Sequence, residues 1–174
     1  MRIRAFGNDR YGPDLAIAVD PNNADRVYIT YVTGTSAADA TLHLRSSDDG
    51  GQNWSSDVRA IPKAKNPSLA INSRGVVGFV YQQVVGANWM TVLEVSRDGF
   101  VASFDTHVLA ITPTNTPTPA SVMATYLGDY LKLLSVGEDF YGIFCAGNEP
   151  VKANFPSDVT YLAQRQLGDT NAAR

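Results

Sequence analysis

The chain has 174 residues, of which 44% are hydrophobic and 18% are charged, and its formal net charge is −3. This length is that of one ordinary domain and allows a sizeable core without disulfides or a structural metal. A single cysteine excludes an intrachain disulfide and a multi-cysteine zinc site, and the mild acidity does not favour nucleic acid as a partner.

Apolar segments of the length needed for a membrane are missing from the sequence. No apolar run approaches the roughly 20 residues of a membrane span, and residues 1–10 lack the apolar stretch of a signal peptide. We therefore expect no membrane partner, and we also expect no metal and no cofactor. The localisation stays open.

Short runs rich in β-branched and aromatic residues follow one another along the chain, bounded by Gly, Pro, Asn and Asp. Such runs predict β-strands. The first four are 13–20, 27–32, 42–47 and 58–61. The next four are 67–73, 77–82, 92–96 and 108–111. The last three are 130–135, 140–145 and 159–164.

These runs form an internal repeat. Pro13-Asp14-Leu15-Ala16-Ile17 returns 54 residues later as Pro67-Ser68-Leu69-Ala70-Ile71. The third repeat lacks its fourth run, whereas residues 3–6 resemble the fourth run of the first repeat. A repeat of about 50 residues with four strands is typical of one blade of a β-propeller. The sequence thus predicts an all-β fold, a β-propeller with four-stranded antiparallel blades, three of them in this chain.

One specific motif lies between the third and fourth runs of the first repeat. Residues 47–54 fit the pattern Ser-x-Asp-x-Gly-x-x-Trp, and residues 96–100 form a partial copy in the second repeat. The pattern resembles the Asp-box, or BNR repeat, of the sialidase-like (neuraminidase) β-propeller superfamily. We interpret the motif as structural, with an acidic side chain that accepts amide hydrogen bonds, a glycine with positive φ and a tryptophan that packs on the hairpin. Its residues are Ser47, Asp49, Gly51, Trp54, Ser96 and Asp98.

The resemblance implies blade boundaries and a six-bladed ring. Blade one is expected over about 12–61, blade two over about 66–112 and blade three over about 126–169. The outer strand of blade three would come from residues 2–6 of the same chain or of a partner chain. Three blades do not close a ring, since closed propellers have about four to eight.

We therefore expect this chain to be half of a six-bladed propeller that a C2 homodimer completes. Two alternatives stay open. In one, the chain is part of a longer propeller whose remainder is missing. In the other, residues 2–6 pair within their own chain and the apolar flanks are covered in another way.

The resemblance also implies a ligand face on the side opposite the Asp-box turns. The loops 62–67 and 84–90 are expected there. Aromatic rings could stack on a sugar, and amides or carboxylates could bind its hydroxyls. Asp129 could also act as a general acid or bind a cation. The candidates are Asp9, Arg10, Tyr11, Asp39, Trp89, Tyr126, Asp129, Tyr130 and Glu149.

The function that we expect is a binding or interaction scaffold for a glycan or another polar ligand. One alternative is a glycoside hydrolase with a carboxylate pair drawn from Asp9, Asp39, Asp129 and Glu149. Another is a purely structural interaction protein. The arginine triad of true sialidases is not matched, so sialidase activity is not expected. His43 is interpreted as a packing or surface residue without a readable partner.

Overall fold

The computed structural model describes residues 15–34, 40–114, 131–146 and 159–164, the last of these by backbone alone. These residues form eleven strands in three antiparallel sheets, so the predicted all-β class is confirmed. They contain no helix that is long and apolar enough to cross a membrane. Residues 2–6, assigned above to an outer strand, lie outside the described residues.

Each sheet is a simple meander in which neighbours along the chain pair in space. Sheet one contains β1 (Leu15–Asp20), β2 (Asn23–Thr33), β3 (Thr41–Ser47) and β4 (Arg59–Pro62). Sheet two contains β5 (Ala64–Ile71), β6 (Val77–Val85), β7 (Asn88–Ser96) and β8 (Asp105–Pro113). Sheet three contains β9 (Lys132–Val136), β10 (Asp139–Cys145) and β11 (Val159–Gln164).

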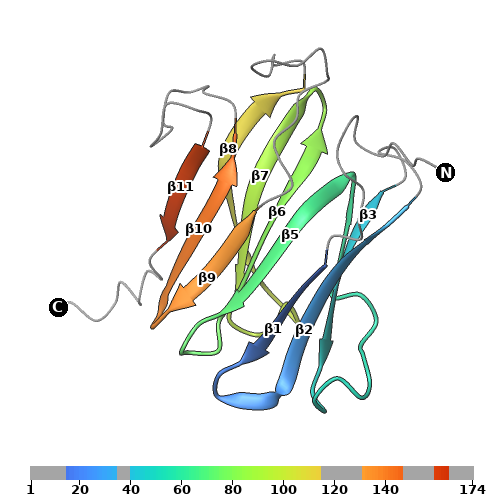
Figure 1. The fold of residues 1–174 in the computed structure, drawn as a ribbon. Coiled ribbons are helices and arrows are strands. Elements are labelled where there is room, and N and C mark those ends of the chain that lie inside the picture. Colours follow the sequence, from blue (N-terminus) through green and yellow to red (C-terminus); the bar gives the residue numbers. More distant parts are fainter. Residues whose placement is uncertain (1–14, 35–39, 115–130, 147–158, 165–174) are drawn as a thin grey trace.

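The first strands of the three sheets lie next to one another. β5 contacts β1 on one side and β9 on the other, and the remaining strands of each sheet fan outward (Figure 1). The sheets therefore stack face to face, with sheet two in the middle. The three sheets follow one another in space in the same order as along the chain.

A first core cluster fills the space between sheets one and two. Tyr28, Leu42 and Leu44 from sheet one are buried against Leu69 and Phe79 from sheet two. On β1 it is the small alternate residues, alanines at 16 and 18, that face this cluster. Because side chains alternate along a strand, the larger apolar residues of β1 point to the opposite face.

A second core cluster joins sheets two and three. It contains Val80 and Leu93 from sheet two and Leu133 and Phe140 from sheet three. Gly78 lies at this contact, where an added Cβ would be 2.8 Å from Phe140 Cε1. Sheet two is therefore buried on both faces, and every residue of β5 is buried.

A buried polar contact also links sheets one and two. Arg59 of β4 donates two hydrogen bonds to Glu94 of β7, at 2.8 and 2.6 Å, and the Tyr81 hydroxyl donates to the same carboxylate at 2.9 Å. The Glu94 side chain is only 2% exposed. Burial, together with the Glu94 charge, raises the pKa of Tyr81 above its usual range. The carboxylate thus depends on Arg59 for its counter-charge.

We predict that Arg59→Met lowers the free energy of unfolding by about 3 kcal/mol, because it leaves the Glu94 carboxylate buried without its cation. The matched control is Arg45→Met, since Arg45 pairs with the partly exposed Asp57 and exposed pairs contribute little. Urea unfolding followed by tryptophan fluorescence measures both variants. Equal losses in the two variants would contradict this account of the contact.

Candidate functional site

The turn between β3 and β4 carries the complete Asp-box motif. The Asp49 carboxylate accepts hydrogen bonds from the Asn53 amide N–H at 2.8 Å and the Asn53 side-chain amide at 2.7 Å. The Ser47 hydroxyl donates to Asp49 at 2.7 Å and accepts from the Gly51 N–H at 2.9 Å. Gly51 has a φ of 89°, which glycine adopts without strain. Trp54 packs on Gly51 and keeps 37% of its surface exposed.

The partial copy between β7 and β8 forms the same turn with different residues. The Ser96 hydroxyl donates to Asp98 at 2.8 Å and accepts from the Phe100 N–H at 2.7 Å. Asp98 also accepts from the N–H groups of Ala102 and Ser103. Phe100 takes the place of the motif glycine with a φ of 67°, and its ring is buried in the first core cluster. The burial of this ring offsets the strain of a positive φ outside glycine.

Both turns lie at the same end of the sheets, where β1–β2 and β5–β6 also turn. The Asp49 and Asp98 carboxylates accept hydrogen bonds from groups of their own turn. The sequence predicted the ligand residues at the opposite end. Eight of the nine lie outside the described residues, namely Asp9, Arg10, Tyr11, Asp39, Tyr126, Asp129, Tyr130 and Glu149. The four carboxylates of the hydrolase alternative are all among these eight.

Trp89, the ninth candidate, does not lie in a loop. It is part of β7, is 7% exposed, and has the Lys65 ammonium 4.8 Å from its ring centre. Residues 64–67 of the loop predicted over 62–67 are likewise part of β5, which begins at Ala64 and has a register shift between Lys65 and Ser68. Trp89 therefore packs within the protein and does not present an open ring for stacking.

A buried cluster of polar side chains begins at Asn66, the residue after Lys65. The Asn66 side chain donates to the Gln82 side chain at 2.8 Å, and Gln82 donates to the Thr91 hydroxyl at 3.3 Å and to the Cys145 carbonyl at 3.1 Å. These residues come from sheets two and three. Hydrogen bonds of this kind satisfy polar groups that burial would otherwise penalise. The cluster supports the end of the sheets that is opposite the Asp-box turns.

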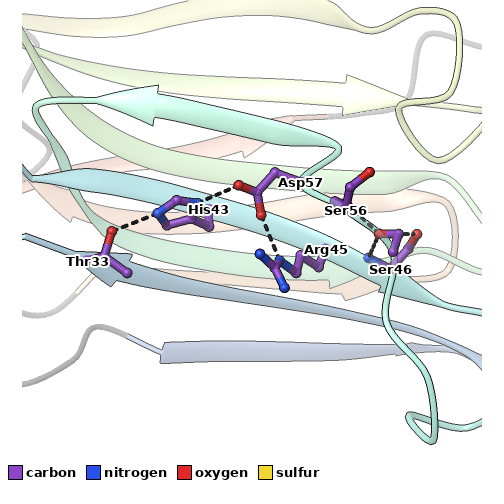
Figure 2. Close-up of polar contacts among 7 residues, drawn as sticks. Thr33, His43, Arg45, Ser46, Ser56 and Asp57 are labelled. Atoms are coloured by element: carbon purple, nitrogen blue, oxygen red, sulfur yellow. Dashed lines mark hydrogen bonds and ion pairs between the residues drawn. The ribbon is translucent and has the colours of Figure 1, made fainter.

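A second polar network lies on the face of sheet one that points away from sheet two (Figure 2). His43 contacts the Asp57 carboxylate through Nδ1 at 2.7 Å and the Thr33 hydroxyl through Nε2 at 2.8 Å. Arg45 donates to the other oxygen of Asp57 at 2.7 Å, and this bond holds the pKa of Asp57 below its usual range. The Tyr31 ring stacks on the His43 ring at 5.0 Å. His43, for which no partner could be read from the sequence, therefore has three in the structure.

The order hydroxyl, imidazole and carboxylate is that of a hydrolase triad. Here, however, Arg45 already occupies the carboxylate, and none of Thr33, His43 and Asp57 lines the cleft described below. The network joins β2, β3 and the segment before β4. We therefore interpret the network as structural, because it holds this part of sheet one together.

A cleft of about 480 Å³ lies where the first strands of the three sheets meet. Leu15 comes from the start of β1, Pro67 and Ser68 from β5, and Leu131 and Lys132 from the start of β9. Trp54 also contributes to its wall. The starts of β1, β5 and β9 belong to the end of the sheets opposite the Asp-box turns. This cleft is a concave site of a size that suits a small ligand.

Among the described residues, no group of three or more His, Cys, Asp or Glu side chains is placed to hold a metal ion. No family model, no curated protein and no solved structure matches the chain.

The Asp49 turn has a predicted pH signature. The hydrogen bonds from the Asn53 backbone and side chain, and then from Ser47, lower the pKa of Asp49 to about 2. A carboxyl whose pKa is lowered on folding stabilises the protein above its unfolded pKa, near 4, and loses this effect as the pH falls to about 2. We expect Asp49→Ala to lower the melting temperature near neutral pH, with a gap from wild type that closes near pH 2.

Thermal unfolding followed by circular dichroism across this pH range measures the gap. Asp48→Ala, which removes the exposed neighbouring carboxylate, is the control and should change the melting temperature little. A gap of the same size at both ends of the range would mean that Asp49 acts through something other than its charge.

Proposed function

We propose that the chain is part of a sialidase-like β-propeller, half of a six-bladed ring, that serves as a binding scaffold for a glycan or another polar ligand. Three features support the propeller. Each sheet is a meander of up to four strands, the first strands lie side by side, and two sheets end in turns with the same Asp-box hydrogen bonds. Such stacking of four-stranded meanders around their first strands is the plan of a propeller.

The cleft at the starts of β1, β5 and β9 is the observation on which the binding role rests. Residues from all three sheets line it, as expected of a site near the axis of a propeller. Its wall combines apolar surface from Leu15, Leu131 and Trp54 with the polar groups of Ser68 and Lys132. A sugar has the same combination, since its ring presents C–H groups on its faces and hydroxyls at its edge.

The two ends of the sheets thus have different roles in this proposal. The end with the Asp-box turns holds the hairpins, because its acidic groups bind their own backbone. The cleft starts at the opposite end, where the buried Asn66–Gln82 cluster supports β5, and it reaches Trp54 of the Asp-box. A rigid support of this kind reduces the entropy lost when a ligand binds.

A glycan array tests the proposal. Wild-type protein is expected to bind at least one glycan class, and Lys132→Met should weaken that binding about tenfold, the loss of one charge-assisted hydrogen bond. Arg97→Met is the matched control, because Arg97 is exposed in the Asp-box-like turn at the other end. It should leave the affinity unchanged.

Equal weakening in both variants would place the ligand elsewhere. If the wild-type protein bound no glycan, the alternative of a purely structural interaction protein would replace the binding role.

A further inference from the structure

Within the part of the chain that the structure describes, sheets one and three each leave one apolar face uncovered. The outer face of sheet one, which points away from sheet two, carries Leu15 and Ile17 of β1 at 64% and 67% exposure, and both also reach the cleft, which this face therefore borders. The outer face of sheet three carries Leu134 and Val136 of β9 at 54% and 65% exposure, together with Ile143 of β10. Large apolar side chains gathered in this way mark an association surface.

The internal repeat shows what the outer face of sheet one is shaped to contact. Leu15 and Ile17 correspond to Leu69 and Ile71, 54 residues later. In sheet two these two residues are each only 6% exposed, because they pack in the core against sheet one. Two neighbouring positions on β2, at 29 and 31, correspond in the same way to the buried Phe79 and Tyr81 of β6. The outer face of sheet one is therefore equivalent to the face of sheet two that sheet one covers.

The sheets also stack in one direction. The face of sheet one that carries Ala16 packs against the Leu69 face of sheet two. The opposite face of sheet two, which carries Ala70, packs against the Leu133 face of sheet three. We call the face of sheet two that packs on sheet one its first face and the opposite one its second face, and we name the equivalent faces of sheets one and three in the same way. Each contact thus joins the second face of one sheet to the first face of the next. The two uncovered faces are one of each kind, a first face on sheet one and a second face on sheet three.

We propose that a second copy of this chain covers both. The outer face of sheet three of one protomer packs on the outer face of sheet one of its partner, and the reverse contact closes the pair about a two-fold axis. The stacking already present inside the chain continues through both contacts, so the two copies form one ring of six sheets. The proposal rests on the propeller arrangement and not on the identity of the ligand.

The polar network on sheet one fits this contact. His43, Arg45 and Asp57 satisfy one another within the sheet, and they lie on β3 and the segment before β4, away from β1. The apolar surface is concentrated on β1 and the polar groups on the outer strands. An apolar centre with a polar border is the usual composition of a protein interface.

Light scattering after size-exclusion chromatography tests the proposal on the full chain. Wild-type protein is expected at twice the 18.8 kDa of one chain. Ile17→Lys on sheet one or Leu134→Glu on sheet three should each weaken association by about a hundredfold or more, because each places a charge in both contacts of the ring. Val101→Lys is the control, since Val101 is 83% exposed on the turn between β7 and β8 and lies on neither face.

Mixing the two variants distinguishes this pairing from others. A mixed ring has one unaltered contact, and its other contact joins the introduced lysine to the introduced glutamate, so the mixture is expected to recover the dimer. All the altered side chains are exposed within one chain, and unchanged melting of the monomeric variants would show that they still fold. A wild-type mass of 18.8 kDa at all concentrations, a mass of three or more chains, or dimers unaffected by either substitution would overturn the proposal.

Discussion

The constraint on which this structure depends is that every sheet carries apolar side chains on both faces. A sheet of this kind is stable in water only when something covers each face. Sheet two meets the requirement within the chain, because sheets one and three cover its two faces. Counting only the described ranges, sheets one and three meet it on one face only. The proposed pairing of two copies follows from this imbalance.

Polar contacts determine how the sheets meet, while apolar burial drives them together. The Glu94 carboxylate is buried between sheets one and two and is matched by Arg59 and Tyr81. Asn72 and Ser135 similarly connect sheets two and three through hydrogen bonds to backbone carbonyls. Contacts of this type cost free energy when they are broken, so they favour one mutual arrangement of the sheets. The Asp-box turns then hold the hairpins at one end, while the cleft starts at the other end and reaches Trp54.

The sequence repeat was sufficient to predict the strands, because each run of β-branched and aromatic residues is bounded by turn residues. It also predicted the Asp49 turn, whose hydrogen bonds depend on residues only two to four positions apart. The start of β5 was predicted three residues too late, because Pro67 was taken as the first residue of the strand. The register shift beside it cannot be read from composition. Trp89 was placed in a loop for a similar reason, since Gly86 and Asn88 suggested a turn that is shorter than expected.

The Thr33–His43–Asp57 network could not be predicted, because it depends on the register of β2 against β3 and on the path of the irregular segment that carries Asp57. One signal was available. His43 and Arg45 are two residues apart on a strand, so they share a face and can meet a common acidic partner. Likewise, the sequence showed only a partial Asp-box over 96–100, with Phe100 in the place of the motif glycine, whereas the buried Phe100 ring compensates for the backbone strain.

The most direct measurement of the central claim is a crystal structure of the wild-type chain. The account predicts two protomers about a two-fold axis, with Leu134 of one protomer buried beside Ile17 of its partner and six sheets in one ring. A structure in which both outer faces stay open to solvent, or in which sheet one packs on sheet one, would contradict it.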